Sequence, residues 1–157
     1  IMKKKLLIYL FILTIITSCG FKVVNYNELL NFQVNQINSS GNKFINYKLK
    51  NKLNKFKNNS KEKLINVNFD SKKEKIIKEK NIKNEITKYE LSVLVNVRVD
   101  LVKQDKEISF QIEEKGDFST AKQYTQTLDN EKKIIETLIE KIYEKILENL
   151  IEYSDEL

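Results

Sequence analysis

The sequence predicts an α+β fold: a two-layer sandwich in which two helices pack on one face of a roughly four-stranded sheet. Two stretches of the 157 residues carry apolar residues at helical spacing, and four carry apolar and polar residues in alternation. The expected order is β-α-β-β-β-α, a pattern typical of a helix layer covering a sheet. Because the sequence has no proline and no internal repeat, we expect one domain over residues 29–157.

The N-terminal part of this domain is expected to contain a strand and a helix. From Leu30 to Val34 apolar and polar residues alternate, which predicts a short strand extending toward Ile37. The segment 38–42 is rich in Asn and Ser, which predicts a turn and a helix start. Apolar residues then recur every three or four positions among lysines, so we expect an amphipathic helix over about 43–57.

Three more strands are expected in the middle of the chain. Alternation predicts a strand over 65–69, and a longer one over 89–102 in which six apolar residues share one face. A polar connection of hairpin length leads to a returning strand over 108–112, which extends toward Phe118. The lysine-rich segment 72–84 is either an extended hairpin arm or a mobile loop.

The last element is predicted to be a long helix. Asp129 is the expected N-cap, and Glu131 in the first turn favours the helix dipole. Two adjacent rows of apolar residues run from Ile134 to Ile151 and form a stripe wide enough to cover a sheet. The opposite face is mostly Glu, the wrong sign for anionic lipid, so the stripe indicates core packing rather than a membrane-surface helix.

Residues 1–18 have the layout of an export signal. Three lysines precede the apolar run 6–16, and small or polar residues follow it. As a helix, residues 6–18 would span only about 20 Å, too short for a comfortable transmembrane anchor.

The end of this signal resembles the bacterial lipobox, since Ile16, Thr17 and Ser18 precede Cys19. The resemblance implies that Cys19 becomes the acylated N-terminus (palmitate-type lipidation) of the mature chain, followed by a flexible leader over 19–28. Several acyl chains hold a protein stably where one does not. Gly20, rather than Asp, follows the cysteine, which favours the outer membrane. The alternative is a secreted protein with an incidental cysteine.

Charge and composition narrow the function classes. The formal net charge is +6, but residues 20–88 carry +10 and residues 89–157 carry −7. Such asymmetry indicates one face or end suited to an anionic partner. Nucleic acid would fit the charge, but export to the envelope removes it as a partner.

Catalysis is not expected. The chain has no His and one Cys, which excludes Ser–His–Asp and Cys–His hydrolases and a Cys-rich zinc site. An enzyme using only carboxylates would need two of them to converge, and Asp100 with Glu113 on neighbouring strands is the available pair. We therefore expect no catalytic residue, no metal and no cofactor.

Several motifs accompany this element order. Cys19-Gly20-Phe21 follows the signal, and the remaining motifs lie within residues 86–150. In chain order they are Tyr89-Glu90-Leu91, Val95-Asn96-Val97, Phe118, Tyr124 and Asp129-Asn130-Glu131. Together they resemble the lipopolysaccharide (LPS)-assembly lipoprotein family, LptE, over most of the mature chain.

The resemblance implies a function, a partner and a ligand site. LptE-like proteins sit in the lumen of a large outer-membrane β-barrel, LptD; they plug it, help it assemble and contact LPS arriving from the periplasm. Family members use basic side chains near the turn before the long strand and near the loop before the last helix. Here those regions offer Lys80, Lys83 and Lys122 as LPS-binding candidates, whereas Ile82 and Leu128 align with the basic family positions.

Two further interpretations remain open. Tyr124 either packs against a barrel wall or covers the protein's own sheet. The chain is alternatively a periplasmic ligand-binding or transport-auxiliary lipoprotein that acts without a barrel. That alternative predicts an apolar pocket between helix and sheet, large enough for an acyl chain.

Overall fold

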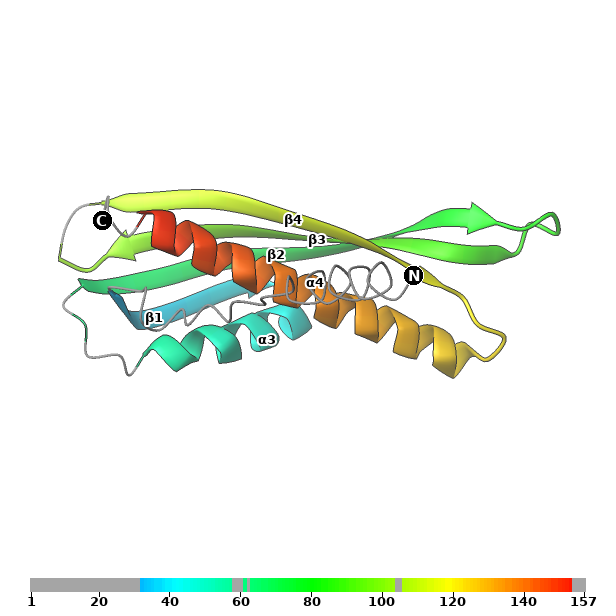
Figure 1. Cartoon of the computed structure of the whole chain (residues 1–157), viewed down its shortest axis with the longest axis horizontal. Coiled ribbons are helices and arrows are strands. Elements are labelled where there is room, and N and C mark those ends of the chain that lie inside the picture. The colour runs from blue at the N-terminus through cyan, green and yellow to red at the C-terminus, as the bar shows by residue number, and fades with distance from the viewer. Residues whose placement is uncertain (1–31, 58–60, 62, 104–105, 154–157) are drawn as a thin grey trace, which may run out of the picture.

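The computed structural model describes residues 32–57, 61, 63–103 and 106–153 (Figure 1). The described elements are β1 (Phe32–Gly41), α3 (Lys43–Leu53), the short 3₁₀ helix η2 (Asn54–Phe56), β2 (Lys63–Lys80), β3 (Ile86–Leu101), β4 (Glu107–Ser119) and α4 (Tyr124–Glu152). This is the predicted α+β fold, in the predicted β-α-β-β-β-α order. The predicted signal, Cys19 and the leader lie outside the described residues.

The four strands form one mixed sheet in the order β1-β2-β3-β4. β1 and β2 are parallel and are joined through α3, because a parallel pair needs a crossover connection. The β2–β3 and β3–β4 pairs are antiparallel hairpins. Both helices lie on the same side of the sheet, and α4 crosses it along much of its length (Figure 1).

The core lies between this helix layer and the sheet. Every second residue of β3 from Leu91 to Leu101 is buried, as its alternation predicts. The facing stripe of α4 is also buried, with Leu138, Ile142 and Ile146 almost completely inaccessible to solvent. Buried side chains therefore fill the interface between helices and sheet.

The alternation in β1 is interrupted by a β-bulge. Val34 pairs with Ile65 in β2, but the next β1 residue in register is Gln36, so Asn35 has no partner strand residue. The extra residue shifts the pleat, and Val34 and Ile37 are both buried although they are three positions apart.

The predicted turn over 38–42 is mostly wrong. Asn38 to Gly41 continue β1, because they remain in register with β2 as far as Ser71. Only Asn42 leaves the strand: its side-chain oxygen accepts hydrogen bonds from the backbone N–H groups of Phe44 and Ile45, at 3.1 and 3.2 Å. Asn42 is thus the N-cap of α3.

A buried polar junction fixes this corner. The Ser71 hydroxyl donates to the Asn46 side-chain oxygen at 2.6 Å, and the Asn46 amide donates to the Ser40 carbonyl at 2.8 Å. Gly41 adopts φ +92°, and a Cβ there would lie 2.0 Å from the Ser71 carbonyl oxygen. The end of β1, the start of α3 and the middle of β2 are therefore locked together.

The ends of both helices differ from expectation. The first helix ends at Leu53 rather than continuing to residue 57, and η2 then places Phe56 in the core. Asp129 is not an N-cap, because α4 already begins at Tyr124, after Gln123. The reason is local: the Thr127 hydroxyl accepts the Ala121 N–H at 2.9 Å and ties the first turn of α4 to the preceding loop.

Of the two alternatives for segment 72–84, the hairpin arm is confirmed. β2 runs unbroken to Lys80, and β3 returns from Ile86. β1 ends opposite Ser71, so from residue 72 onward β2 has no neighbour on that side. We call residues 72–94 the hairpin arm and residues 80–86 its tip; the tip projects beyond both helices (Figure 1).

Candidate functional site

The arm tip is a defined turn held mainly by one side chain. The Asn81 side-chain oxygen accepts the N–H groups of Lys83 and Glu85, both at 2.9 Å, and its amide donates to the Glu85 carboxylate at 2.7 Å. Asn84 adopts φ 63°, a left-handed conformation that Asn tolerates better than most residues. The sequence thus builds a fixed turn at the far end of the arm.

Two of the predicted LPS-binding lysines lie on this tip. Lys80 donates to the Asn84 side-chain oxygen at 3.1 Å. Neither Lys80 nor Lys83 makes an ion pair with any residue that the structure describes. Ile82 between them is fully exposed, and Ile76 and Ile77 lower on the arm are about half exposed. The tip therefore combines unneutralised ammonium groups with exposed apolar side chains.

Lys122 lies on a different element, the β4–α4 loop. It lines a groove of about 310 Å³ at the base of the arm. The other lining residues are Lys75, Ile86, Tyr89, Thr120, Ala121, Tyr124, Thr127 and Leu128. Tyr124 is 74% exposed, so its ring does not cover the sheet.

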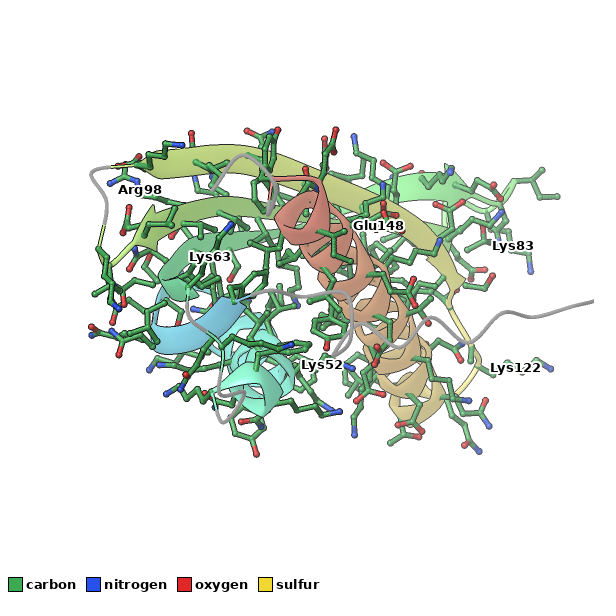
Figure 2. The ribbon with its side chains drawn as sticks, turned by 60° about the vertical axis from the view of Figure 1, so that its left-hand side comes forward. Lys52, Lys63, Lys83, Arg98, Lys122 and Glu148 are labelled. Carbon is green, nitrogen blue, oxygen red and sulfur yellow. The ribbon has the colours of Figure 1, made fainter. Side chains whose placement is uncertain are left out.

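The three candidate lysines are at one end of the molecule but do not form a single cluster. Figure 2 shows Lys83 and Lys122 at the end remote from Arg98, each projecting from its own element. An anionic ligand that meets all three must therefore be extended, or must bridge the tip and the groove.

The groove also contains a cluster that the sequence reasoning missed. The Lys75 ammonium lies 4.4 Å from the centre of the Tyr89 ring and 5.1 Å from that of Phe118, and these two rings stack at 5.4 Å. Lys75 also forms an ion pair with Glu131 of α4 at 2.6 Å. A signal existed: Lys73 and Lys75 continue the buried alternation of β2 and so face α4.

Glu131 joins the arm to the helix layer. Its carboxylate accepts from both Lys73, at 3.2 Å, and Lys75, and its side chain is only 14% exposed. Burial alone would raise the pKa of Glu131, but the hydrogen bonds from Lys75 and Lys73 outweigh it, and the pKa lies below the ordinary 4.5. Glu131 is therefore ionised, and it keeps the base of the arm against α4.

The positive N-terminal half is partly neutralised by the acidic C-terminal half. Lys48 and Lys52 of α3 pair with Glu136 and Glu140 of α4 at 3.0 and 2.7 Å. On the arm, Lys78 pairs with Asp117 at 2.6 Å and with Glu90 at 3.3 Å. Lys88 pairs with Glu79 of the same half at 2.8 Å. The charge division along the chain is thus not one broad cationic face.

The pair of carboxylates considered for catalysis does not converge. Asp100 is in register with Glu107 of β4, whereas Glu113 is in register with Leu94, six residues along β3. That offset corresponds to about 20 Å along a strand. Within the described ranges, no three Cys, Asp or Glu residues cluster as a metal site would require, and no helix is long and apolar enough to cross a membrane.

The barrel-independent alternative predicted an apolar pocket between helix and sheet. The groove at the arm base does lie between the first turns of α4 and the sheet, and it is lined by Lys75, Lys122 and hydroxyl groups as well as by apolar side chains. A second concavity lies on the opposite sheet face. Among the described residues the centre of the helix–sheet interface is filled by side chains from all four strands and both helices. The packing therefore weakens the alternative for the centre of this interface and leaves the arm-base groove as its one candidate pocket among those described.

Comparisons with known proteins identify the fold. No protein-family model matches the sequence, and no curated protein matches it significantly. Among solved structures, a protein of Caulobacter crescentus described as a lipoprotein matches with a TM-score of 0.57 and 13% identity, covering 83% of this chain and 95% of that one. Lipoprotein B of Nitrosomonas europaea matches with a TM-score of 0.55 and 14% identity, covering 87% and 93%.

The chain shares its fold with bacterial lipoproteins. A third match, the rare lipoprotein B of Shewanella oneidensis, has a TM-score of 0.49 and 15% identity, covering 78% of this chain and 95% of that one; the fold assignment depends on the first two. At these identities the similarity establishes architecture and does not transfer residues.

Proposed function

We propose that this protein is an outer-membrane lipoprotein of the LptE type. In this role it is anchored by acylated Cys19, plugs an LptD-like LPS-export β-barrel, supports barrel assembly, and contacts LPS on its way to the outer leaflet. The observation that carries the proposal is the coincidence of a lipobox with a fold found in lipoproteins.

The arrangement of the chain suits a plug that meets its ligand at the end far from its anchor. Cys19 is 13 residues before Phe32, where β1 begins, a distance of at most about 45 Å. Phe32 pairs with Lys63, the first residue of β2. The tip begins at Lys80, at the other end of this 18-residue strand, about 60 Å away. In the proposed complex the tip would face LPS that arrives from the periplasm.

The chemistry of that end suits an anionic amphiphile. Lys80, Lys83 and Lys122 have no carboxylate partner among the described residues, so their ammonium groups are free to meet the phosphates of LPS. Exposed Ile82 and Leu128 lie beside them and can contact acyl chains. Apolar residues at these two positions would shift part of the recognition from charge to hydrophobic contact.

Copurification from the native envelope tests the partner. Crosslinking followed by detergent extraction should recover the protein with a large β-barrel, and mass spectrometry should identify that barrel. Recovery of a monomer alone would contradict the plug assignment while leaving the lipoprotein assignment in place.

Charge reversal tests the ligand site. The triple variant Lys80→Glu, Lys83→Glu and Lys122→Glu should bind purified LPS about 10- to 100-fold more weakly at low salt, since three attractive charges become repulsive. The control reverses three exposed lysines of the helix layer for the same change in net charge: Lys43→Glu, Lys55→Glu and Lys141→Glu. Equal losses in the two variants would remove the three candidates from the site.

A further inference from the structure

The sheet face opposite the helices is hollowed across all four strands. The concavity has a volume of about 690 Å³. It lies on the other side of the sheet from the arm-base groove, because most of its lining side chains alternate with the buried ones. Phe69, Val97 and Phe110 also border it, from positions whose side chains pack in or against the core. Six polar residues that line it are Asn38, Ser40, Asn68, Asp70, Asn96 and Gln111.

The concavity is nearly uncharged in a protein dominated by charge. The chain has 27 lysines and one arginine, yet none of the described residues that line the concavity is a lysine. Its two charged residues, Asp70 and Arg98, have opposite signs, and the Arg98 guanidinium also pairs with Glu107 at 3.0 Å. A phosphate or sulfate would find no excess of positive charge here.

Cross-strand hydrogen bonds fix the orientation of part of this surface. The Asn38 amide donates to the Asn68 side-chain oxygen at 2.9 Å, and the Asn68 amide donates in turn to Asp100 at 2.8 Å. The Ser40 hydroxyl donates to the Asp70 carboxylate at 2.6 Å. These bonds leave further lone pairs and N–H groups of the same side chains pointing outward in set positions.

A second group of polar side chains on this face makes no hydrogen bond to any described residue. Asn96 and Gln111 are directly opposite each other on β3 and β4, and both are exposed. Neither amide, nor the Ser109 hydroxyl beside them, makes a hydrogen bond within the described part of the chain. Each of these groups can both donate and accept.

The chemistry of this face selects one ligand class. An acyl chain or a hydrophobic peptide would leave these polar groups without partners, which is costly once water is excluded. Each hydroxyl group of a sugar both donates and accepts hydrogen bonds, as the amides and hydroxyls of this face do. These side chains repeat about every 5 Å from strand to strand and about every 7 Å along a strand. We propose that the concavity on the outer sheet face binds a neutral oligosaccharide.

The proposal does not depend on LPS export. The proposed LPS contacts are on the arm and on the helix side of the sheet, and the saccharide surface is on the other side. The bound sugar is either a free polysaccharide segment or the uncharged glycan of a larger envelope glycolipid. Both sources offer the same hydroxyl chemistry.

Saturation-transfer NMR on the detergent-solubilised full-length lipoprotein tests the site. The probes are neutral hexasaccharides of glucose, mannose and galactose, with a heparin hexasaccharide as the anionic comparison. At least one neutral probe should receive saturation, and the variant Asn96→Ala with Gln111→Ala should weaken its binding about tenfold, since the hydrogen bonds from two amides to the sugar are lost. The control, Gln126→Ala, truncates an exposed amide on α4 and should bind as the native protein does.

Two results would overturn the proposal. They are the absence of transfer to every neutral probe, with or without transfer to heparin, and equal binding by the double variant and the native protein. The source of the sugar is separated by competition. Rough LPS has a truncated glycan, whereas smooth LPS carries the full one. If only smooth LPS displaces the hexasaccharide, the site binds the distal glycan of LPS. If neither form displaces it, the site binds a free polysaccharide. Because the three lysines proposed to bind LPS are intact in both variants, failure here leaves the proposed function unaffected.

Discussion

Gly41 and Gly116 each lie close to another part of the chain, but Gly41 faces backbone and Gly116 faces a side chain. At Gly41 a Cβ would meet the backbone of Ser71 at 2.0 Å, and the residue has φ +92°; at Gly116 it would meet the flexible side chain of Ile134 at 3.1 Å. We expect Gly41→Ala to lower the free energy of unfolding by about 2–4 kcal/mol, because backbone cannot move aside. Gly116→Ala should cost about 1 kcal/mol or less, since α4 side chains can adjust. Urea denaturation measures both, and equal costs would contradict the assigned cause.

Glu131 makes the stability of the folded protein depend on pH in the acidic range. Its pKa is lowered in the folded state, so its contribution to stability is full above the ordinary value of 4.5 and is lost as the pH falls through the lower, folded-state pKa. We expect Glu131→Gln to be less stable than the native protein at pH 7 by up to about 1 kcal/mol, a value discounted for solvent screening. The difference should shrink as the pH falls below 4.5.

Denaturation midpoints of native and variant protein at several pH values measure this effect. Glu144→Gln, which removes an exposed carboxylate with no ion pair in the described part of the chain, is the matched control and should show little pH-dependent difference. A gap between native and Glu131→Gln protein that stays constant with pH would show that the lost interaction is not ionic.

Among the elements, the hairpin arm is the one whose order depends on its own turn. β1 does not pair with the arm, because it ends opposite Ser71 of β2. No helix covers the tip of the arm (Figure 1). We expect Asn81→Ala, which removes the turn's side-chain bonds, to increase amide hydrogen exchange in residues 76–88 by about 10-fold or more. Exchange of the buried β3 segment 93–99 should not change. Loss of protection throughout the sheet would instead show that the arm is part of the cooperative core.

The elements also show how far sequence reasoning can reach. Strong periodicity predicted β3 and most of α4, because each must bury one regular face. The length of β2 was left open between a hairpin arm and a loop, since beyond Ser71 its inward positions hold Lys73 and Lys75, which do not continue the apolar alternation. Their partner Glu131 is 56 residues away from Lys75 along the chain, so the lysine–aromatic cluster requires strand register, which local pattern cannot supply. The bulge at Asn35 could not be predicted either, because it is defined by the register between β1 and β2.

For the whole molecule, the division of charge changes meaning on folding. The sequence predicted one end for an anionic partner from the +10 and −7 segments. In the fold these segments lie against each other: α3 faces α4, and Lys73 and Lys75 of the arm face Glu131. What remains for a partner is the set of lysines that the fold leaves without carboxylates. That set includes Lys80, Lys83 and Lys122, which lie at one end of the molecule. The predicted anionic partner would therefore meet these few lysines rather than a whole positive half.

The orientation of the whole molecule at a membrane follows from where the predicted anchor joins it. The leader enters at Phe32, at the end of the sheet remote from the tip. With Cys19 acylated, a dye at Val102 should lie closer to the bilayer than a dye at Ile82, because Val102 hydrogen-bonds to Leu64 near the start of β2. The two sites are separated by most of the roughly 60 Å of β2.

Energy transfer in vesicles measures this orientation. Val102→Cys and Ile82→Cys can each be labelled selectively, since the chain's one native cysteine is the predicted acylation site. Transfer to acceptor lipids should be clearly stronger from position 102 than from position 82. Cys19→Ser should abolish vesicle binding, which confirms that the anchor is the acyl group. Equal or stronger transfer from position 82 would mean that the apolar tip dips into the bilayer, and the tip would then be a membrane contact rather than a contact for arriving LPS.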